Sequence, residues 1–389
     1  MGTAPLADRR RSLISPRALA GRELGLGESG RAGGRDMKYG LVVGLCMVGF
    51  GACQVLALPP EAAKEREVAD ELSRPGSLTV MTRSLGLEAG LRPVLETPRA
   101  AELPERTAEL FTGLRQMDVE ARARALADEL QYARPHLLGL QDVWQVRTQQ
   151  QGDALFGGTR PATEVVVDFL PLLLGELESR GLRYREVGRV RNTDVELPMR
   201  ARNAPGYEDA RFTSFDVVLA RTDVQVANTG SRSYRAHRTV KVPGQGELVR
   251  QRGWVSVTAT VGTRSYRFVS THLEPAPDEA GLRVQLAQAE ELITALRGEP
   301  LPVVLVGDFN TPAHLGLVGA PTYRELLLAG YVDVWSRQQA APDWKRLHLI
   351  LVRQGEAHQP RQLGPVRAWP LEEQHGLVAR LRMPLARRP

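Results

Sequence analysis

From Ser77 onward, short apolar runs typical of buried strands alternate with segments whose apolar residues recur at helical spacing. The runs predict strands over 77–84, 136–142, 254–262, 266–274, 301–310, 347–353 and 375–383, within a β-rich stretch from 183 to 274. The helical spacing predicts helices over 106–134, 162–181, 279–296 and 322–330. We expect the second helix to be broken or kinked at Pro171 and to end at Gly181. No internal repeat or deep break interrupts the pattern, which therefore predicts one α+β domain over 77–385.

Composition narrows the class of protein that this domain belongs to. The chain has 389 residues, of which 42% are hydrophobic and 25% are charged, as in globular proteins. Its two cysteines, Cys46 and Cys53, share one apolar stretch, which excludes a disulfide framework and a structural zinc cluster. Most of the net charge of +6 lies before Cys53, because seven Arg face four acids in 1–36 and Lys38 follows. The remaining body is only weakly basic, which does not favour a dedicated nucleic-acid surface.

The segment from Met37 to Cys53 has the pattern of a secretory signal. A lysine precedes a short apolar run, which is too short to span a bilayer stably, and small residues come before Cys53. The FGAC ending resembles the lipobox of bacterial lipoproteins, in which the cysteine is lipid-modified; a buried core helix is the alternative. We therefore predict a dispensable extension or misjudged start over 1–36, a signal peptide over 37–52, and a lipidated Cys53 with its tether over 53–76. The predicted location is the cell envelope, either lipid-anchored or secreted.

Three of the predicted strands end in polar side chains that can carry out chemistry. These side chains are Gln141 and Asp142, then Thr271, His272 and Glu274, and finally Asp308 and Asn310. If the strands lie in neighbouring sheets, their ends can converge on one edge. Carboxylates, an amide and an imidazole at one edge are the groups that metal-assisted hydrolysis requires.

Each of these residues has a chemical role in phosphodiester cleavage that suits its side chain. Asp142 is the candidate ligand of Mg²⁺ (or Mn²⁺), since hard cations prefer oxygen ligands. Asp308 could orient or deprotonate the attacking water, and Asn310 could donate to a phosphate oxygen. His272 and His375 could stabilise negative charge or protonate the leaving group. Taken singly, each residue is also compatible with a turn, a cap or a hydrogen bond at the rim.

The motifs GLQD (139–142), STHL (270–273) and VGDFN (306–310) resemble those of the endonuclease/exonuclease/phosphatase superfamily. The resemblance covers nearly all of the chain after Ser77. It implies a four-layer α/β/β/α sandwich and a divalent-metal-dependent phosphoester hydrolysis without a covalent intermediate, at the rim of the sandwich. It also implies that Asp142 is the metal carboxylate, and that Asp308 and Asn310 orient the water. His272 would be the histidine that contacts phosphate, and His375 the terminal catalytic histidine.

Four positions depart from the family pattern. Ser84 stands for an asparagine near the metal, Asp142 for a glutamate, and His348 and Gln374 for two aspartates. The loss of two acids predicts weaker metal binding and histidines without an acidic partner. Two hypotheses therefore stay open: a phosphoesterase with weakened catalysis, and a catalytically inactive, lipid-anchored binding or scaffold protein that retains the fold.

The expected partners follow from the enzyme hypothesis. The substrate would be a phosphodiester of a nucleic acid or of a phospholipid headgroup, and the lipid anchor would hold the protein at a membrane surface. The protein itself is expected to be a monomer.

Overall fold

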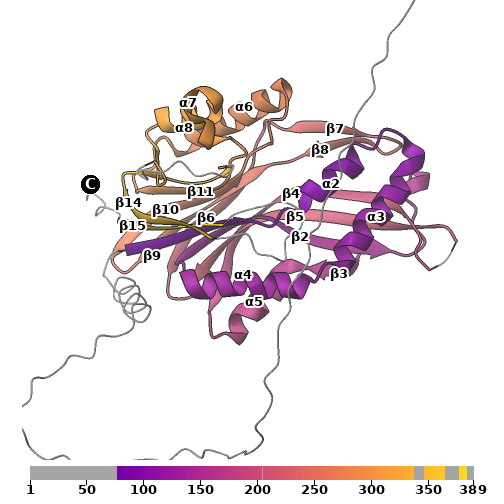
Figure 1. Ribbon diagram of the computed structural model, residues 1–389, viewed down its shortest axis with the longest axis horizontal. Helices are drawn as coiled ribbons and strands as arrows, with labels where there is room; N and C mark the ends of the chain where they lie inside the picture. Colours follow the sequence, from indigo (N-terminus) through magenta and orange to yellow (C-terminus); the bar gives the residue numbers. More distant parts are fainter. Residues whose placement is uncertain (1–76, 204, 337–345, 364–375, 383–389) are drawn as a thin grey trace, which may run out of the picture. The chain divides into compact units, whose positions relative to one another are not determined.

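The computed structural model describes residues 77–203, 205–336, 346–363 and 376–382, all within one compact unit, Pro60–Pro389. Two large β-sheets dominate it (Figure 1). The first sheet has the order β14 (Glu356–Leu363), β15 (Gly376–Arg382), β1 (Ser77–Ser84), β2 (Leu137–Gln149), β5 (Tyr207–Arg221), β4 (Tyr184–Arg200), with β3 (Glu164–Asp168) paired to β2. The second has the order β12 (Val332–Asp333), β13 (His348–Arg353), β11 (Val303–Asp308), β10 (Arg264–His272), β9 (Gly253–Val261), β6 (Gln225–Ser233). A separate hairpin joins β7 (Arg238–Val242) and β8 (Gly246–Arg250).

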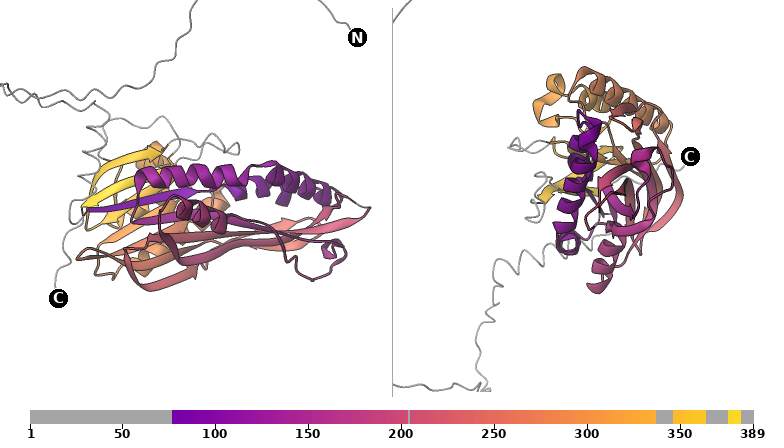
Figure 2. Two further views of the ribbon diagram at one scale, coloured as in Figure 1. Left: turned by 90° about the horizontal axis from the view of Figure 1, so that it is seen from below. Right: turned by 90° about the vertical axis from the view of Figure 1, so that its right-hand side faces the viewer.

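Helices cover the outer face of each sheet (Figure 2). The first sheet packs against α2 (Leu87–Leu95), α3 (Leu103–Gln116), α4 (Val119–Ala133) and α5 (Phe169–Ser179). The second packs against α6 (Glu279–Leu296) and α8 (Pro321–Leu328). The short helices are η1 (Ala100–Glu102), η2 (Ala154–Phe156), η3 (Ala313–Leu315) and α7 (Gly316–Gly319). A third apolar cluster fills the space between the sheets, so the predicted α+β fold, a four-layer α/β/β/α sandwich, is confirmed.

Each sheet has a parallel pair of strands at its centre. β1 pairs with β2, with Ser84 opposite Gln141, and β10 pairs with β11, with His272 opposite Asp308. The segments α2 to α4 and α6 supply the crossovers that parallel pairs require. Because parallel strands end at the same edge, this topology brings the polar residues at their ends together.

The two sheets approach closely beneath this edge. A Cβ at Gly139 would lie 2.5 Å from Oγ of Ser270, so only glycine fits there. Two residues further along β2, Gln141 links the two sheets. Its side chain accepts from the Thr82 hydroxyl at 2.8 Å and donates to the Ser270 hydroxyl at 2.9 Å. The glutamine of the GLQD motif therefore has a structural task between the sheets.

Most predicted elements agree with the structure, and α6 agrees residue for residue, but two predicted helices were wrong in detail. The segment 106–134 forms two helices, because the side chain of Asp118 caps a new helix by accepting from the Ala121 amide at 2.7 Å. The segment 162–181 begins as β3, a β-branched run, and becomes helical only at Phe169. Pro171 therefore lies in the first turn of α5, where no backbone donor is needed, and the helix continues past it unbroken. The helix does end before Gly181, which has a φ of 70°.

Several predictions concern residues outside the described ranges. They are the extension over 1–36, the signal peptide, Cys53 and its tether, and the pair Gln374 and His375. Among the helices that the structure describes, none is long and apolar enough to cross a membrane.

Candidate functional site

Two strands of the second sheet, β10 and β11, end where the antiparallel β13 begins, and they present His272, Asp308 and His348, which we call the His–Asp–His group. Nε2 of His272 lies 3.8 Å from Oδ2 of Asp308, and Nε2 of His348 lies 3.4 Å from the same oxygen. All three side chains are buried. The strand register explains the arrangement, because Asp308 is opposite His272 on one side and opposite His348 on the other.

The turn after β11 orients the Asp308 carboxylate. Gly307 has a φ of 150°, and a Cβ there would lie 1.9 Å from the Thr271 carbonyl oxygen, so the motif requires glycine. Oδ1 of Asp308 accepts from the backbone amide of Asn310 at 3.0 Å, which turns Oδ2 toward the imidazoles. The Asn310 side chain donates to the Leu273 carbonyl at 2.8 Å, so it also ties this turn to the end of β10.

Asp142 reaches the same region from a β-bulge and not from a strand end. β2 continues beyond it, and the pairing with β5 shifts between Leu140 and Val143, so the predicted end at 142 was wrong. The bulge gives Asp142 a φ of 60°. Its Oδ2 accepts from the Glu88 amide at 2.7 Å, and its own amide donates to Asp216 at 3.2 Å. Burial, together with the negative charge of Glu88, raises the pKa of Asp142 to about 7.

Glu88 is a site residue that the sequence analysis missed. It lies in the first turn of α2, where Gly86, with a φ of 73°, turns the chain after β1. Its carboxylate accepts from Thr193 at 2.8 Å and forms an ion pair with Arg252. Burial works to raise the pKa of Glu88, but the charges of Arg252, His272 and Arg250 outweigh burial and hold it at about 2. Because α2 itself was not predicted, no signal in the sequence pointed to this residue.

Arg252 is a buried cation at the centre of four carboxylates, Glu88, Asp142, Asp216 and Glu274, which we call the acidic cluster. Nε of Arg252 lies 3.5 Å from Glu274, and its Nη1 lies 3.1 Å from Nδ1 of His272. Burial works to lower the pKa of Arg252, but the four carboxylates outweigh burial and raise it.

A second arginine, Arg250, lies 3.3 Å from Glu274 and 3.8 Å from Glu88. The guanidinium groups of Arg250 and Arg252 thus face the four carboxylates of the acidic cluster. When Asp142 is ionised, the two arginines and the four carboxylates together keep a negative formal charge.

The expectation that the histidines lack an acidic partner was wrong for His272. Oδ1 of Asp216 lies 3.6 Å from its Nδ1, and Asp308 lies beyond its Nε2. Burial and the charge of Arg252 work to lower the pKa of His272, but these two carboxylates outweigh them and raise it. Asp216 is fully buried. In the sequence it is a single acidic residue within the apolar run of β5, and this was the one signal that could have identified it.

The model of the Endonuclease/Exonuclease/phosphatase family matches residues 113–365, more than half of the chain. The chain belongs to this family. Its members are in general hydrolases of phosphoester bonds. No curated protein matches the chain.

Several solved structures are similar to this one at low sequence identity. An endonuclease/exonuclease/phosphatase from Beutenbergia cavernae DSM 12333 is 17% identical, with 80% of this chain and 72% of that one covered and a TM-score of 0.49. D. rerio TDP2, complexed with a single-strand DNA product, is 14% identical, with 78% and 98% covered and a TM-score of 0.46. A mannosyl-6-phosphatase from Bacteroides thetaiotaomicron VPI-5482 is 16% identical, with 78% and 99% covered and a TM-score of 0.42.

Enzymes of the endonuclease/exonuclease/phosphatase family typically use divalent metal ions, and the donor chemistry here fits such an ion. Oδ1 of Asp142 and Oδ2 of Asp216 are buried carboxylate oxygens without a hydrogen-bond partner. Within the described ranges, no three His, Cys, Asp or Glu side chains are grouped so as to hold a metal by themselves. Mg²⁺ in particular binds through one or two carboxylates together with water and substrate oxygens, so two free oxygens are a sufficient protein contribution.

The departures from the family pattern have structural counterparts. Ser84 is buried at the end of β1, opposite Gln141 on β2. His348 contributes an imidazole next to Asp308 at the position expected for an acid. Glu88, Asp216 and Glu274 supply more carboxylates than the motifs alone predict. The roles assigned to Asp142, His272, Asp308, Asn310 and His375 remain predictions.

The raised pKa of Asp142 predicts how Asp142→Asn changes stability without metal. Asp142 stays protonated in the folded state up to about pH 7, against 3.8 for an ordinary aspartate, so the penalty for burying its charge is absent below 3.8 and complete above about pH 7. Asparagine keeps the acceptor for Glu88 and avoids the charge. As the pH rises from about 5 to about 8, we expect the free energy of unfolding of Asp142→Asn, relative to that of wild type, to increase by on the order of 2 kcal/mol.

Urea unfolding of the variant and of wild type at about pH 5 and about pH 8, in the presence of a metal chelator, measures this difference. Asp128→Asn, at an exposed position on α4, is the matched control and should show no such gain. Equal stability differences at both pH values would contradict the prediction.

Proposed function

We propose that this protein hydrolyses phosphoesters at the edge where β10 and β11 end and β13 begins. The observation that supports the proposal best is the His–Asp–His group, which lies next to Asp142 and Asp216, each with one carboxylate oxygen that accepts no hydrogen bond. A buried carboxylate flanked by imidazoles can move a proton, and the neighbouring oxygens can hold a cation against a phosphate.

Asp308 is the residue that would accept the proton of the attacking water. Its Oδ1 is held by the Asn310 amide, so Oδ2 keeps a fixed orientation. His272 and His348 lie on either side of that oxygen and would stabilise negative charge on the phosphate. The Asn310 side chain uses one hydrogen for Leu273, which leaves a second for a phosphate oxygen. His375 keeps its proposed role in protonating the leaving group.

Asp142 and Asp216 would hold Mg²⁺ or Mn²⁺. A bound divalent ion would supply positive charge to the phosphate during hydrolysis.

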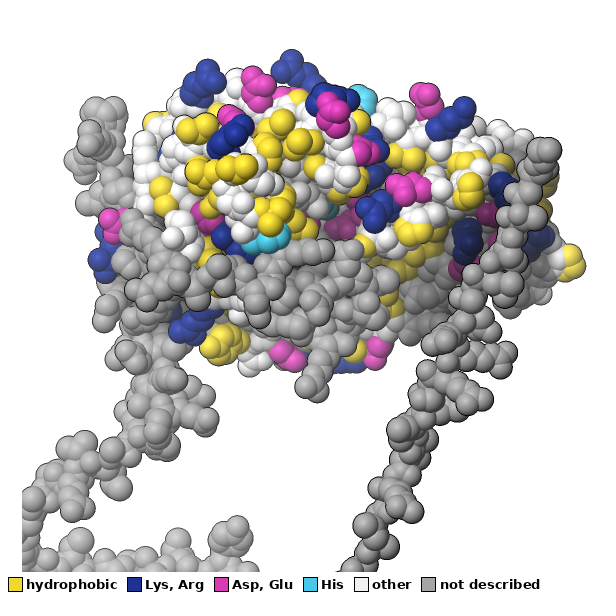
Figure 3. Space-filling view, turned by 45° about the horizontal axis from the view of Figure 1, so that its top comes forward, with side chains coloured by type: hydrophobic (Ala, Val, Ile, Leu, Met, Phe, Trp, Pro, Cys, Tyr) yellow, Lys and Arg dark blue, Asp and Glu magenta, His cyan; other side chains and the backbone are white. Residues whose placement is uncertain are grey.

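The proposed substrate is a phosphodiester of a nucleic acid or of a phospholipid headgroup. On the face in Figure 3, basic and acidic side chains are interspersed with hydrophobic ones. A long single-sign surface, which non-specific binding to a nucleic-acid strand favours, is not what this face presents. Binding is therefore expected to depend on groups close to the reacting phosphate.

The test is hydrolysis of bis(4-nitrophenyl) phosphate by the full chain, with Mg²⁺, with Mn²⁺ and with a chelator. Turnover that requires the metal supports the proposal. The second candidate is the inactive scaffold, which the partial neutralisation of the acidic cluster by Arg250 and Arg252 favours. Absence of turnover, together with no rise in Tm at millimolar metal, would favour the scaffold over the enzyme.

We also propose that the protein is a monomer attached to a membrane of the cell envelope through lipid on Cys53. Cys53→Ser is expected to move the protein from the membrane fraction to the soluble fraction, because the thiol carries the lipid. Fractionation by ultracentrifugation measures this, and Cys46→Ser is the matched control that should stay in the membrane fraction. A Cys53→Ser protein that still sediments with membranes would contradict lipid anchoring.

A further inference from the structure

Asn192 is buried and has no hydrogen-bond partner for either atom of its side-chain amide. It lies on β4, where the pairing with β5 shifts between Arg191 and Asp194 and leaves Asn192 and Thr193 out of the ladder. A buried amide without partners is costly to a fold, so a native protein that keeps one needs another reason to do so.

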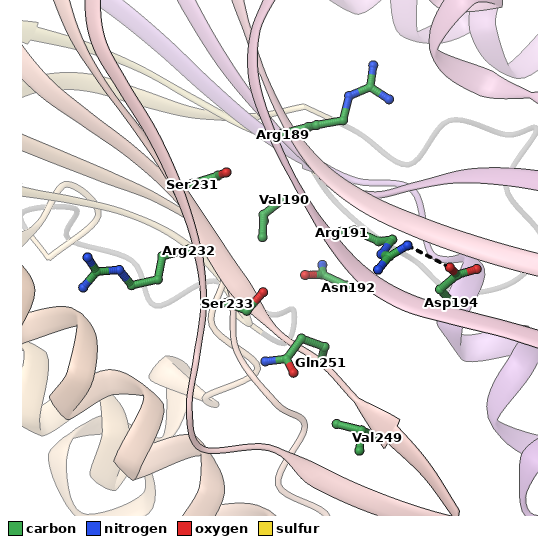
Figure 4. Close-up of a pocket in the computed structure, with 10 residues that line it drawn as sticks. All are labelled: Arg189, Val190, Arg191, Asn192, Asp194, Ser231, Arg232, Ser233, Val249 and Gln251. Atoms are coloured by element: carbon green, nitrogen blue, oxygen red, sulfur yellow. Dashed lines mark hydrogen bonds and ion pairs between the residues drawn. The ribbon is translucent and has the colours of Figure 1, made fainter.

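The amide lines a cavity of about 510 Å³ between the edge strands of the two sheets (Figure 4). The size is that of a small-molecule site. Figure 4 shows Asn192 directed toward β6, with Ser231 and Ser233 directed back toward it and Gln251 beside them. The aliphatic part of the lining comes from Val190 and Val249.

Four of the residues that line this cavity are charged, and each of them has a partner. Arg189 pairs with Glu186 at 2.6 Å, and Arg191 pairs with Asp194 at 3.0 Å. The guanidinium of Arg232 lies over the Trp254 ring, 5.8 Å from its centroid, on the far side of β6 from Asn192. Beside these paired charges, the lining offers the neutral donors and acceptors of Asn192, Ser231 and Ser233 next to aliphatic carbons, and such groups complement hydroxyl groups on a carbon ring or chain.

The cavity adjoins the acidic cluster through the backbone. Thr193, which follows Asn192, donates to Glu88, and Gln251 precedes Arg252. A ligand in the cavity is thus placed to present an attached phosphate to the cluster.

We propose that this cavity binds the hydroxyl groups of a sugar or polyol, and that the substrate is a phosphoester of such a group. The binding part stands on the cavity alone, whereas the naming of a substrate class rests on the proposed function. The same hydroxyl chemistry occurs in a nucleotide and in a polyol headgroup, and the two probes below distinguish them.

The experiment compares three probes on the full chain by isothermal titration calorimetry, without metal. They are inorganic phosphate, ribose 5-phosphate and myo-inositol 1-phosphate. We expect one or both organic phosphates to bind roughly tenfold more tightly than inorganic phosphate, as one or two net hydrogen bonds provide. The tighter of the two identifies the source.

Asn192→Leu should abolish this difference and leave the binding of inorganic phosphate unchanged. Because leucine replaces an unpartnered amide with an apolar group of similar shape, its Tm should equal or exceed that of wild type. Ser233→Ala should reduce the difference partly. Asn203→Leu, the same substitution at an exposed residue outside the cavity, should leave it intact.

The outcomes separate this inference from the proposed function. Organic phosphates that bind no more tightly than inorganic phosphate, or an unchanged difference in Asn192→Leu, would overturn it, as would a large fall in Tm of that variant. Sugar binding that depends on Asn192 without any hydrolysis would support the cavity and contradict the enzyme. Hydrolysis of a phosphoester without sugar binding that depends on Asn192 would support the enzyme and contradict the role of the cavity.

Discussion

Asp308→Asn is expected to lower kcat/KM for hydrolysis of a phosphodiester by about a thousandfold, within the range that general-base catalysis contributes. Asparagine keeps the acceptor for the Asn310 amide, so the turn after β11 should be preserved. What it removes is the negative charge that faces His272 and His348. Initial rates with an activated phosphodiester in Mg²⁺ or Mn²⁺ measure the loss.

Two comparisons make this result interpretable. The Tm of Asp308→Asn should stay near that of wild type, and Asp128→Asn, on the exposed face of α4, should keep full activity. A variant at Asp308 that is folded and retains activity within about threefold of wild type would contradict a proton-transfer role for this carboxylate.

Arg252→Met is expected to lower the free energy of unfolding by about 3–5 kcal/mol at neutral pH, the cost of breaking a buried ion pair from one side. Arg252 is 1% exposed, and its loss leaves Glu88 and Glu274 buried with Arg250 as their remaining guanidinium partner. The loss should be smaller at acid pH, because Glu88 without the charge of Arg252 takes up a proton there. Urea unfolding at both pH values measures the effect.

The charge, rather than the packing, should account for most of this loss. Arg252→Lys keeps the charge and should be less destabilised, and adding Glu88→Gln to Arg252→Met should recover part of the stability. Arg324→Met, which removes an exposed pair with Glu325, should cost less than about 1 kcal/mol. An Arg252→Met protein as stable as wild type would show that the acidic cluster does not need this cation.

The motifs predicted the second sheet's part of the site well, for a physical reason. STHL and VGDFN each end a strand of a parallel pair, and the register of such a pair places their last residues side by side. The glycine in VGDFN is required by a backbone approach of β11 to β10, which no other residue permits. Short-range geometry of this kind is encoded in a few adjacent residues, so sequence alone could identify His272 and Asp308.

Asp142 was identified for its chemistry but not for its conformation. The apolar run before it predicted a strand end, whereas the structure continues β2 through a bulge. Whether a strand stops or bulges depends on the neighbouring strand β5, which lies far away in the sequence. The interruption at Asp118 was readable in retrospect, since a cap acts within a few residues.

By itself, the sequence determined the alternation of strands and helices and placed His272 and Asp308 at strand ends, because hydrophobic periodicity and tight turns are local properties. The four-layer sandwich was implied by the resemblance of the motifs to a known family, and His348 was noted only as a departure from the pattern of that family. Only the tertiary structure decided that Glu88, Asp216, Arg250 and Arg252 surround the same point. These residues come from α2, β5 and the segment at the end of β8 and the start of β9. Each is an ordinary charged residue in its own segment, and its charge acquires meaning only where burial removes water and leaves the other charges as its partners.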